Sequence, residues 1–180
     1  VLKLRVVSET VKVKASLALE KQFVIMASGT TIIRKGFDLL AVIAKELKQT
    51  RKRNFKLVWI GVNKNKDLFH LVKSEVDRFD VSDVVSFVES VPNPIVYFNA
   101  CDLFLMLSRE DPFPLVCIEV AQLSKPILCF ANSVGSEEFI GAVKENVIDY
   151  LNIEKLCDRI EYYMDNQAKR AEDGELMKVE

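Results

Sequence analysis

Two acidic side chains near the middle of the chain could bind the hydroxyl groups of a ligand. Asp111 and Glu119 stand eight positions apart in the segment SREDPFPLVCIE, residues 108–119. Glu119 lies among apolar residues (LVCIEVA) of a predicted helix, and a carboxylate in such surroundings usually has a designated partner. Capping of helix amides by Ser108, Glu110 and Asp111 is the structural alternative. An acid within an apolar helix face is hard to explain by capping alone.

The start of the same predicted helix is a place for an anion. Pro114 suits the first helical position, because its missing N–H would be unpaired there anyway. The free amides of Leu115 and Val116 then point out of the N-terminus, where the helix dipole favours negative charge. Glu119, one turn later, is close enough to accept hydrogen bonds from the hydroxyls of a ligand held there.

A second candidate loop is SGTTIIRKG, residues 28–36, which follows an apolar run. Small residues such as Gly29 and Thr30 let a phosphate approach the backbone, and Arg34 and Lys35 can neutralise it. The spacing is neither GxGxxG nor GxxxxGK[ST], which argues against ordinary dinucleotide and P-loop sites. A solvated loop with a helix-opening glycine is the alternative interpretation.

A third loop, ANSVGSEEFIG at residues 131–141, has a weaker signal. Gly135 predicts a tight turn, and Glu137 and Glu138 suit the first turn of a short helix, where the dipole favours acids. A purely structural role explains this segment equally well.

Composition excludes several classes of function. With 49% hydrophobic residues, 6 Gly and 5 Pro in 180 positions, the chain is neither disordered nor collagen-like. Lys+Arg 25 against Asp+Glu 26 creates no strong field for nucleic acid. The four cysteines form no CxxC and His70 is the only histidine, which argues against zinc and against a histidine-based triad. We expect free cysteines in a reducing cytosol, and no metal.

Apolar runs and helical periodicity alternate from Phe23 onward. Strands are expected at residues 23–27, 56–61, 84–88, 103–107, 126–130 and 147–151, and helices at 37–47, 67–79, 94–100, 114–123, 136–143 and 153–164. Val42 and Leu71 are placed on the packing faces of the first two helices. Continuously apolar strands are those covered on both faces, so the pattern predicts an α/β, Rossmann-like, doubly wound parallel sheet. Ligands bind such sheets at the carboxyl ends of the strands, where all three loops lie.

The ends of the chain are assigned separately. Residues 1–20 are a lead-in segment, with residues 1–14 expected to be extended because Leu2, Leu4 and Val6 alternate. Residues 21–165 form the predicted domain. Residues 166–180 are too polar for a core and are expected to be a surface helix or a tail.

In this order, the segments resemble the C-terminal, donor-binding domain of a GT-B glycosyltransferase of the retaining family 4, glycosyl transferases group 1. The resemblance runs from about Phe23 to Met164. It rests on RKGFDLL at 34–40, KLVWIG at 56–61, VVSFVESV at 84–91, YFNACDLFLMLS at 97–108, EDPFPLVCIEVAQLSKPIL at 110–128 and GSEEFI at 135–140. The two acids eight positions apart, before a strand such as KPILCF, are the most specific piece.

The resemblance implies a role for each site residue. Lys35 contacts the donor diphosphate, with Gly29, Thr30 and Arg34 beside it, and Glu119 holds the ribose hydroxyls. Asp111 lies beside the donor sugar; the family usually has glutamate there, so Glu110 is the other candidate for this catalytic position. The backbone that cradles the diphosphate and sugar corresponds to Phe113, Pro114, Leu115 and Val116.

The chain departs from the family pattern at three further points. Ser28-Gly29 replaces a frequent Gly-Arg, and Pro114 replaces a common glycine, which removes one amide donor. The N-terminal acceptor domain is expected to be missing from this chain. The fragment should therefore bind a donor without transferring the sugar.

The resemblance implies retaining transfer of a sugar from a nucleotide diphosphate sugar, without cofactor or metal. The leaving phosphate would assist front-side attack, as is proposed for this fold. The implied partners are the donor and the protein's own N-terminal domain, with no nucleic acid; membrane contact would involve only the missing domain. The setting would be cytoplasmic. A non-catalytic sugar-nucleotide binding or scaffold module is the main alternative, and an epimerase of similar fold is a third.

Overall fold

The computed structural model describes residues 2–19 and 21–178, with residues 2–7 described by their backbone alone. Its centre is a six-stranded sheet in the order β3-β2-β1-β4-β5-β6, in which every neighbouring pair is parallel. The strands are β1 (Phe23–Ser28), β2 (Phe55–Val62), β3 (Val85–Glu89), β4 (Leu103–Met106), β5 (Ile127–Phe130) and β6 (Val147–Ile148). The predicted Rossmann-like sheet is confirmed, with each strand within a few residues of its predicted position.

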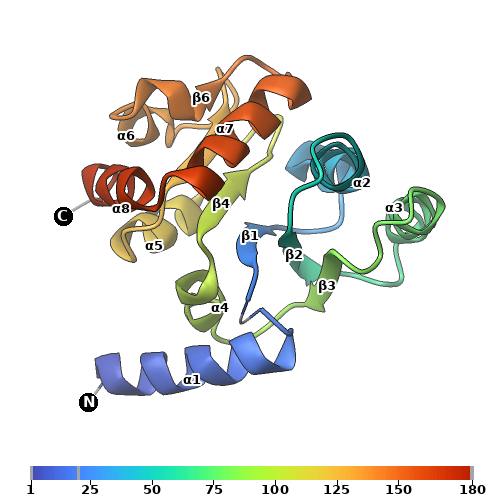
Figure 1. Ribbon diagram of the computed structural model, residues 1–180, viewed down its shortest axis with the longest axis horizontal. Helices are drawn as coiled ribbons and strands as arrows, with labels where there is room; N and C mark the ends of the chain where they lie inside the picture. The colour runs from blue at the N-terminus through green and yellow to red at the C-terminus, as the bar shows by residue number, and fades with distance from the viewer. Residues whose placement is uncertain (1, 20, 179–180) are drawn as a thin grey trace.

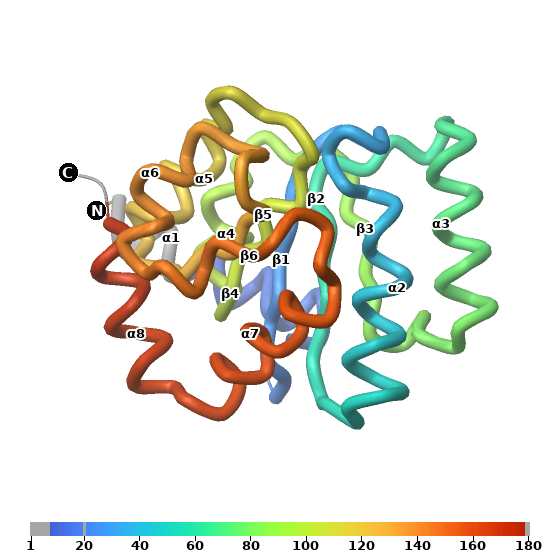
Figure 2. Tube along the Cα trace, turned by 90° about the horizontal axis from the view of Figure 1, so that it is seen from above, coloured from blue at the N-terminus to red at the C-terminus, as the bar shows by residue number. Residues whose placement is uncertain are grey.

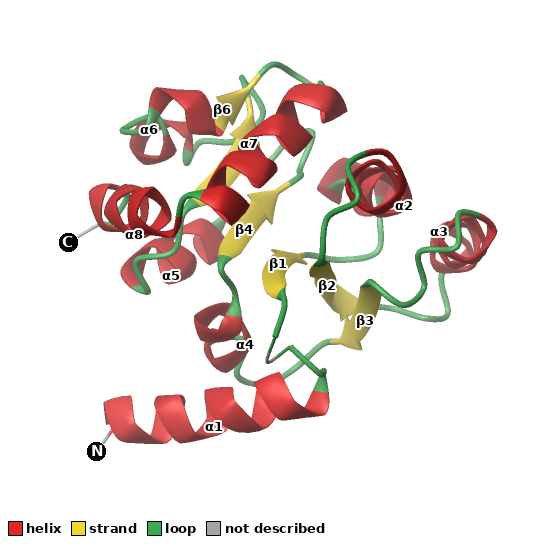
Figure 3. Ribbon diagram, in the orientation of Figure 1, coloured by secondary structure: helices red, strands yellow, loops and turns green. Residues whose placement is uncertain are grey.

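Helices alternate with the strands along the chain (Figure 3). They are α1 (Leu2–Ser16), α2 (Leu40–Lys45), α3 (Asp67–Arg78), α4 (Ile95–Ala100), α5 (Leu115–Gln122), α6 (Glu137–Ile140), α7 (Ile153–Asp165) and α8 (Gln167–Leu176). Two 3₁₀ turns, η1 (Ile33–Lys35) and η2 (Phe37–Leu39), lead into α2, a π-helical turn, η3 (Glu46–Thr50), extends it, and η4 (Lys144–Asn146) precedes β6.

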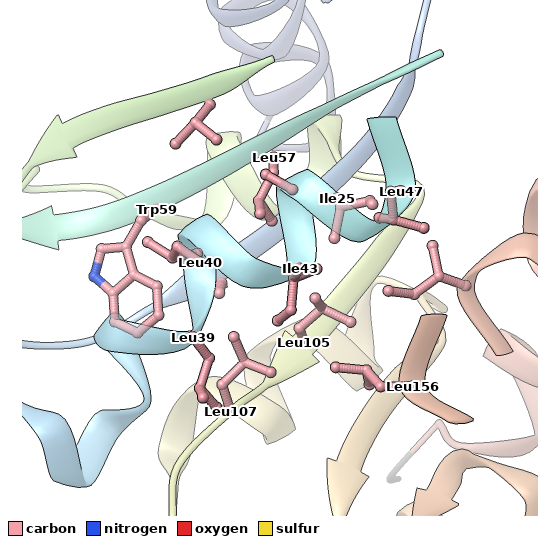
Figure 4. Close-up of a cluster of buried hydrophobic side chains, with 14 of the residues drawn as sticks. Ile25, Leu39, Leu40, Ile43, Leu47, Leu57, Trp59, Leu105, Leu107 and Leu156 are labelled. Atoms are coloured by element: carbon pink, nitrogen blue, oxygen red, sulfur yellow. The ribbon is translucent and has the colours of Figure 1, made fainter. Parts of the chain in front are cut away.

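Helices cover both faces of the sheet, because its strands are apolar on both sides. Buried side chains of α2, α3 and α7 pack on one face, and those of α4 and α5 pack on the other. Figures 1 and 2 show α2 and α3 together on one side, with α1, α4 and α5 on the opposite side. Figure 4 shows the first core, where Leu40 and Ile43 of α2 lie against Leu57 and Leu105 of the sheet.

The prediction of an extended segment over residues 1–14 was wrong, because residues 2–14 form most of α1. The alternating apolar residues were misleading, since tertiary contacts decided the conformation. The Thr10 hydroxyl donates to the Val96 carbonyl of α4 at 3.2 Å, and Val13 and Leu17 pack on the second core. A helix places residues 10, 13 and 17 on one side, which alternation does not reveal.

The predicted packing of two side chains needs correction. Val42 and Leu71 were assigned to packing faces, but they are 40% and 64% exposed and lie on the outer sides of their helices. Residues 167–176 form a helix, as one alternative for the tail proposed. This part of the chain is not wholly superficial, because Asp173 is fully buried and Met177, which follows the helix, is 1% exposed within the second core. Residues 1, 20, 179 and 180 of the assigned ends lie outside the described residues.

The Asp173 carboxylate explains how a polar segment becomes buried. It accepts hydrogen bonds from the Tyr163 hydroxyl at 2.8 Å and from Arg159 at 3.1 Å, both on α7. Such partners offset the cost of removing a charge from water. No helix among the described residues combines the length and apolar character needed to cross a bilayer.

Candidate functional site

The candidate site lies where the strand order reverses. β1 pairs with β2 on one side and with β4 on the other, so the chain leaves β1 and β4 toward opposite faces of the sheet. This reversal opens a crevice at the carboxyl ends of the two strands, the usual ligand position in open α/β sheets. The loops after β1 and β4 are the two with the strongest predicted chemistry. Figure 1 shows the two strands side by side in the middle of the sheet.

An ion pair joins these two loops. The Lys35 ammonium donates to the Asp111 carboxylate, and the two side chains are 20% and 12% exposed. The residues are 76 positions apart in the sequence, so the fold alone brings them together. Of the two candidate acids, Asp111 is the one paired with Lys35, whereas Glu110 is exposed.

Further hydrogen bonds fasten the loop after β1 to the loop after β4. Arg34 donates from its guanidinium to the Glu110 carbonyl at 2.8 Å, and its own carbonyl accepts from the Arg109 amide at 2.8 Å. The Arg109 guanidinium binds both oxygens of the Asp38 carboxylate, at 2.8 and 2.7 Å. Sequence reasoning missed Arg109 and Asp38. The available signal was the position of Arg109, directly between a buried strand and the predicted acids.

The third loop also joins the site. The Asp111 amide donates to the Ser133 carbonyl at 2.9 Å, and the Gly135 amide donates to the Asp111 carbonyl at 3.1 Å. Asp111 and Val134 form an isolated parallel bridge. A Cβ on Gly135 would stand 2.0 Å from the Pro112 carbonyl oxygen, so only glycine permits this approach. The expected convergence of the three loops is therefore observed, and Asp111 lies at their junction.

A glycine also lets the first loop lie close to β4. Gly36 has φ +78°, in the left-handed region, and a Cβ there would stand 2.2 Å from the Leu107 carbonyl oxygen. At the start of the loop, the Trp59 indole N–H donates to the Gly29 carbonyl at 2.9 Å. The Thr31 hydroxyl accepts from the Asn63 amide at 2.8 Å. Thr30, the other predicted hydroxyl residue, is exposed.

The first turn of α5 is open for a ligand. Pro114 occupies the N-cap rather than the predicted first helical position, so the helix begins one residue later than predicted. No side chain caps the helix. The acids that might have capped it are engaged elsewhere or exposed, which argues against the capping interpretation. Phe113 and Leu115 are 68% and 63% exposed beside these amides, and Val116 is partly buried.

Glu119 is half-buried on α5 and has no hydrogen bond or ion pair within the described part of the chain. Its neighbours Cys117 and Val120 are buried in the second core. A carboxylate half-withdrawn from water without a partner retains its full capacity to accept hydrogen bonds. This matches the predicted role of a group that receives hydroxyls.

The chemistry of the surrounding groups argues against a thiol nucleophile. Burial raises the pKa of the Cys117 thiol to about 12, with a smaller opposing contribution from Ser136. The charges of Asp111 and Lys35 also reach this thiol, so the ion pair lies near the first turn of α5. All four cysteines are buried. Among the described residues, no cluster of histidine, cysteine and acidic side chains is suited to hold a metal ion.

A hollow of about 580 Å³ lies elsewhere, where the end of α1 meets the start of β1 and β2. It is lined by Ala15, Ala18, Lys21, Gln22, Asn54 and Lys56. This is the amino edge of the parallel sheet, opposite the three loops. This hollow is therefore separate from the candidate site.

Similar solved structures include proteins in complex with UDP and proteins named as glycosyltransferases. The structure of Anabaena HepE in complex with UDP superimposes with a TM-score of 0.83, at 18% identity, over 95% of this chain and 47% of that chain. Sucrose-phosphate synthase from Thermosynechococcus elongatus gives a TM-score of 0.76, at 20% identity, over 91% and 42% of the two chains. At such identities these likenesses establish the fold.

Sequence comparison agrees with the structural comparison. An uncharacterized glycosyltransferase of Haemophilus influenzae is 27% identical over 156 residues, which are 85% of this chain and 42% of the relative. The chain thus spans less than half the length of this relative. The family model described as "Glycosyl transferases group 1" matches residues 9–175, nearly the whole sequence. The chain therefore belongs to the glycosyl transferases group 1 family.

Proposed function

We propose that this chain is the C-terminal, donor-binding domain of a retaining glycosyltransferase of family 4. The main support comes from one edge of the sheet, where Lys35, Asp111 and the uncapped start of α5 meet. The unpartnered Glu119 lies one turn further along the same helix. Two cations, free amides and a hydroxyl acceptor are the groups that a nucleotide diphosphate sugar requires. HepE has been solved with UDP and with UDP-glucose, which supports this class of ligand for the shared fold.

In this proposal the donor diphosphate lies between the first turn of α5 and the loop after β1. The amides of Leu115 and Val116 and the cations of Arg34 and Lys35 stabilise the charge that develops on the leaving phosphate. Arg34 is exposed and has no acidic partner in the described part of the chain, so it is ready for an anion. Lys35 must exchange its Asp111 partner for the phosphate.

The remaining groups hold the sugar and the nucleoside. Glu119 accepts the ribose hydroxyls, and Asp111, with the neighbouring Glu110, stands beside the sugar. Fixed amides and cations bear the leaving-group charge, so no metal or other cofactor takes part. The buried thiols supply no nucleophile, which is consistent with front-side attack assisted by the leaving phosphate.

The acceptor is held by an N-terminal domain of the longer protein, which acts in the cytoplasm without nucleic acid as a partner. The chain's share of its relatives, 42% and 47% of their lengths, supports this arrangement. The isolated domain therefore binds the donor and transfers no sugar. A non-catalytic binding or scaffold module is the second candidate, favoured by the Lys35–Asp111 pair, which occupies one of the two phosphate-binding cations.

Calorimetry with UDP, GDP and ADP tests donor binding, with the matching nucleosides as controls. Because half of the cleft is missing, we expect one diphosphate to bind with a dissociation constant on the order of tens of micromolar to millimolar. The nucleosides should bind more weakly, since they lack the group that Arg34, Lys35 and α5 receive. No binding of any diphosphate at millimolar concentration would contradict the proposal and leave only a scaffold role.

A further inference from the structure

Arg109 is directed into the protein rather than toward a ligand. Its side chain is 22% exposed, and its guanidinium donates to both oxygens of Asp38, at 2.8 and 2.7 Å. The same guanidinium donates to the Ile33 carbonyl, and the Arg109 backbone amide donates to the Arg34 carbonyl at 2.8 Å. Arg109 thus binds two successive carbonyls in the loop after β1, those of Ile33 and Arg34. It also binds the carboxylate of Asp38, which lies in the 3₁₀ turn η2.

The turn that Arg109 holds has little other support. The 3₁₀ turn Ile33–Lys35 contains no buried residue, and no side chain caps it. Ile33 is 57% exposed, so hydrophobic burial does not fasten the turn. Short 3₁₀ turns also have poor hydrogen-bond geometry of their own. The direction in which Arg34 and Lys35 point therefore depends on polar contacts from outside the turn.

We propose that Arg109 is a positioning residue, whose bidentate pair with Asp38 holds Arg34 and Lys35 in the orientation that receives the donor diphosphate. The inference rests on the proposed function for the identity of the ligand. Arg109 itself does not bind the donor in this proposal, because both terminal nitrogens of its guanidinium donate to Asp38. The hydrogen bonds that Arg109 donates to Asp38 also raise the pKa of Arg109, which favours its charged form. Bidentate pairs of this kind give geometric specificity as well as attraction.

A positioning role affects the phosphates and not the nucleoside. If UDP is the diphosphate that binds, Arg109→Gln should weaken UDP binding about tenfold, because misplaced cations lose favourable contact geometry. Uridine binding should change little, since uridine does not contact these cations. The ratio of UDP to uridine affinity should therefore fall about tenfold. Should GDP or ADP bind instead, the same ratio is measured with the corresponding nucleoside.

Two further variants separate geometry from charge. Arg109→Lys keeps the charge but loses the fork, so it should restore the affinity ratio only in part. Asp38→Asn should lower the ratio as Arg109→Gln does. Because both changes break the same pair, the double variant should show no additional loss.

Arg53→Gln is a matched control at the amino edge of the sheet. Arg53 is also a partly buried arginine, 26% exposed, and it pairs with Asp165 and Glu161. Loss of this pair removes a comparable ionic contact far from the candidate site. The Tm of Arg53→Gln should fall about as much as the Tm of Arg109→Gln. The ratio of UDP to uridine affinity should not change in Arg53→Gln.

Hydrogen exchange measures the turn independently of any ligand. The amides of Lys35 and Gly36 bond within the turn, to Ile32 and Ile33. In Arg109→Gln, peptides that cover residues 33–37 should exchange faster than in wild type, and in Arg53→Gln they should not. Unchanged exchange, or an unchanged affinity ratio in a chain that binds the diphosphate, would overturn the proposal.

The two proposals can fail separately. If wild-type chain binds no diphosphate, the proposed function fails. Faster exchange in Arg109→Gln alone would then support Arg109 as the residue that holds the turn, and equal exchange would overturn it.

Discussion

The two edges of the parallel sheet treat their charged side chains differently. At the amino edge, Arg51 is 14% exposed and contacts three carboxylates, those of Glu46, Asp158 and Glu161. These contacts join the end of α2 to α7. Burial opposes the charge of Arg51, but the three acids outweigh it and raise its pKa. Lys48 is likewise paired, with Asp83 at 2.6 Å.

The carboxyl edge leaves part of its charge available. Arg34 is exposed, and its only acceptor within the described residues is a carbonyl, that of Glu110. Glu119 has no partner there, and the helix that carries it begins without a side-chain cap. Lys35 and Arg109 are exceptions, because Asp111 already binds the first and Asp38 the second.

The difference is between charges that are paired within the protein and charges that have no partner of opposite sign among the described residues. Both edges contain arginines, lysines and acids, so residue type alone does not distinguish them. The paired cations of both edges connect elements of the fold, but among these described residues only the carboxyl edge also has a cation without an acidic partner, Arg34, and an acid without a partner, Glu119. Substitutions at the amino edge should therefore change stability, and substitutions at the carboxyl edge should change binding.

Glu119→Ala should have the largest effect on binding. Loss of the hydroxyl acceptor should weaken UDP binding by about 1–3 kcal/mol, with little change in the free energy of unfolding. Uridine should lose affinity as well, because the ribose is common to both. Calorimetry on the folded variant measures this. Glu138→Ala, an exposed glutamate at the same edge, is the control, and an equal loss in both variants would contradict the role of Glu119.

Arg51→Gln should have the largest effect on stability. The change removes the cation that three neighbouring carboxylates share and leaves only Glu161 with another in the described part of the chain, Arg53, so it should lower the free energy of unfolding by about 2 kcal/mol. Urea denaturation measures the loss, and UDP affinity should not change. Arg78→Gln is the control, since Arg78 is 67% exposed and 3.7 Å from Glu75 in an exposed pair. A weakened UDP affinity in Arg51→Gln would erase the proposed division between the edges.

Asp111→Asn tests the carboxyl-edge pair in which Lys35 already has an acidic partner. From sequence, this acid should matter little for a bare nucleoside diphosphate. The ion pair with Lys35 changes that expectation, because removal of the carboxylate frees a cation and a repulsive charge disappears. UDP should bind about fivefold more tightly, a gain of about 1 kcal/mol, which is the interaction of two unit charges about 4 Å apart in water. Asparagine preserves the backbone bonds to the third loop. Glu110→Gln should have less effect, and weaker UDP binding in Asp111→Asn would show that Asp111 does not compete for Lys35.

Asp83→Asn should have the smallest effect. The hydrogen bond from Lys48 lowers the pKa of Asp83, so the carboxylate stabilises the fold above its unfolded pKa. This contribution is lost as the pH falls through the lowered folded pKa. The Asp83 side chain is 63% exposed, and solvent screening limits the effect at neutral pH to less than about 0.5 kcal/mol. Thermal unfolding should show a small difference at pH 7 that disappears as the pH falls below the lowered folded pKa of Asp83. A larger difference in acid would contradict the assignment.

The strands and the site loops could be predicted because local properties specify them. Val58 and Leu105 lie in continuously apolar runs, which are stable only as strands buried on both faces. Parallel strands bring all their carboxyl ends to one edge, so the loops that contain Lys35 and Asp111 could be expected to meet. The residue types then indicated an anion and a hydroxylated ligand.

The sequence by itself determined the alternation of strands and helices, the edge at which chemistry gathers and the residue types placed there. Tertiary structure alone decided that residues 2–16 are helical, since that conformation depends on contacts of Thr10 and Val13 with α4 and the second core. It also decided that Asp111 binds Lys35 and that Arg109 binds Asp38, across 76 and 71 positions. Hydrophobic periodicity reports which side of an element is buried. The partner of a charge depends on which elements the fold places beside it.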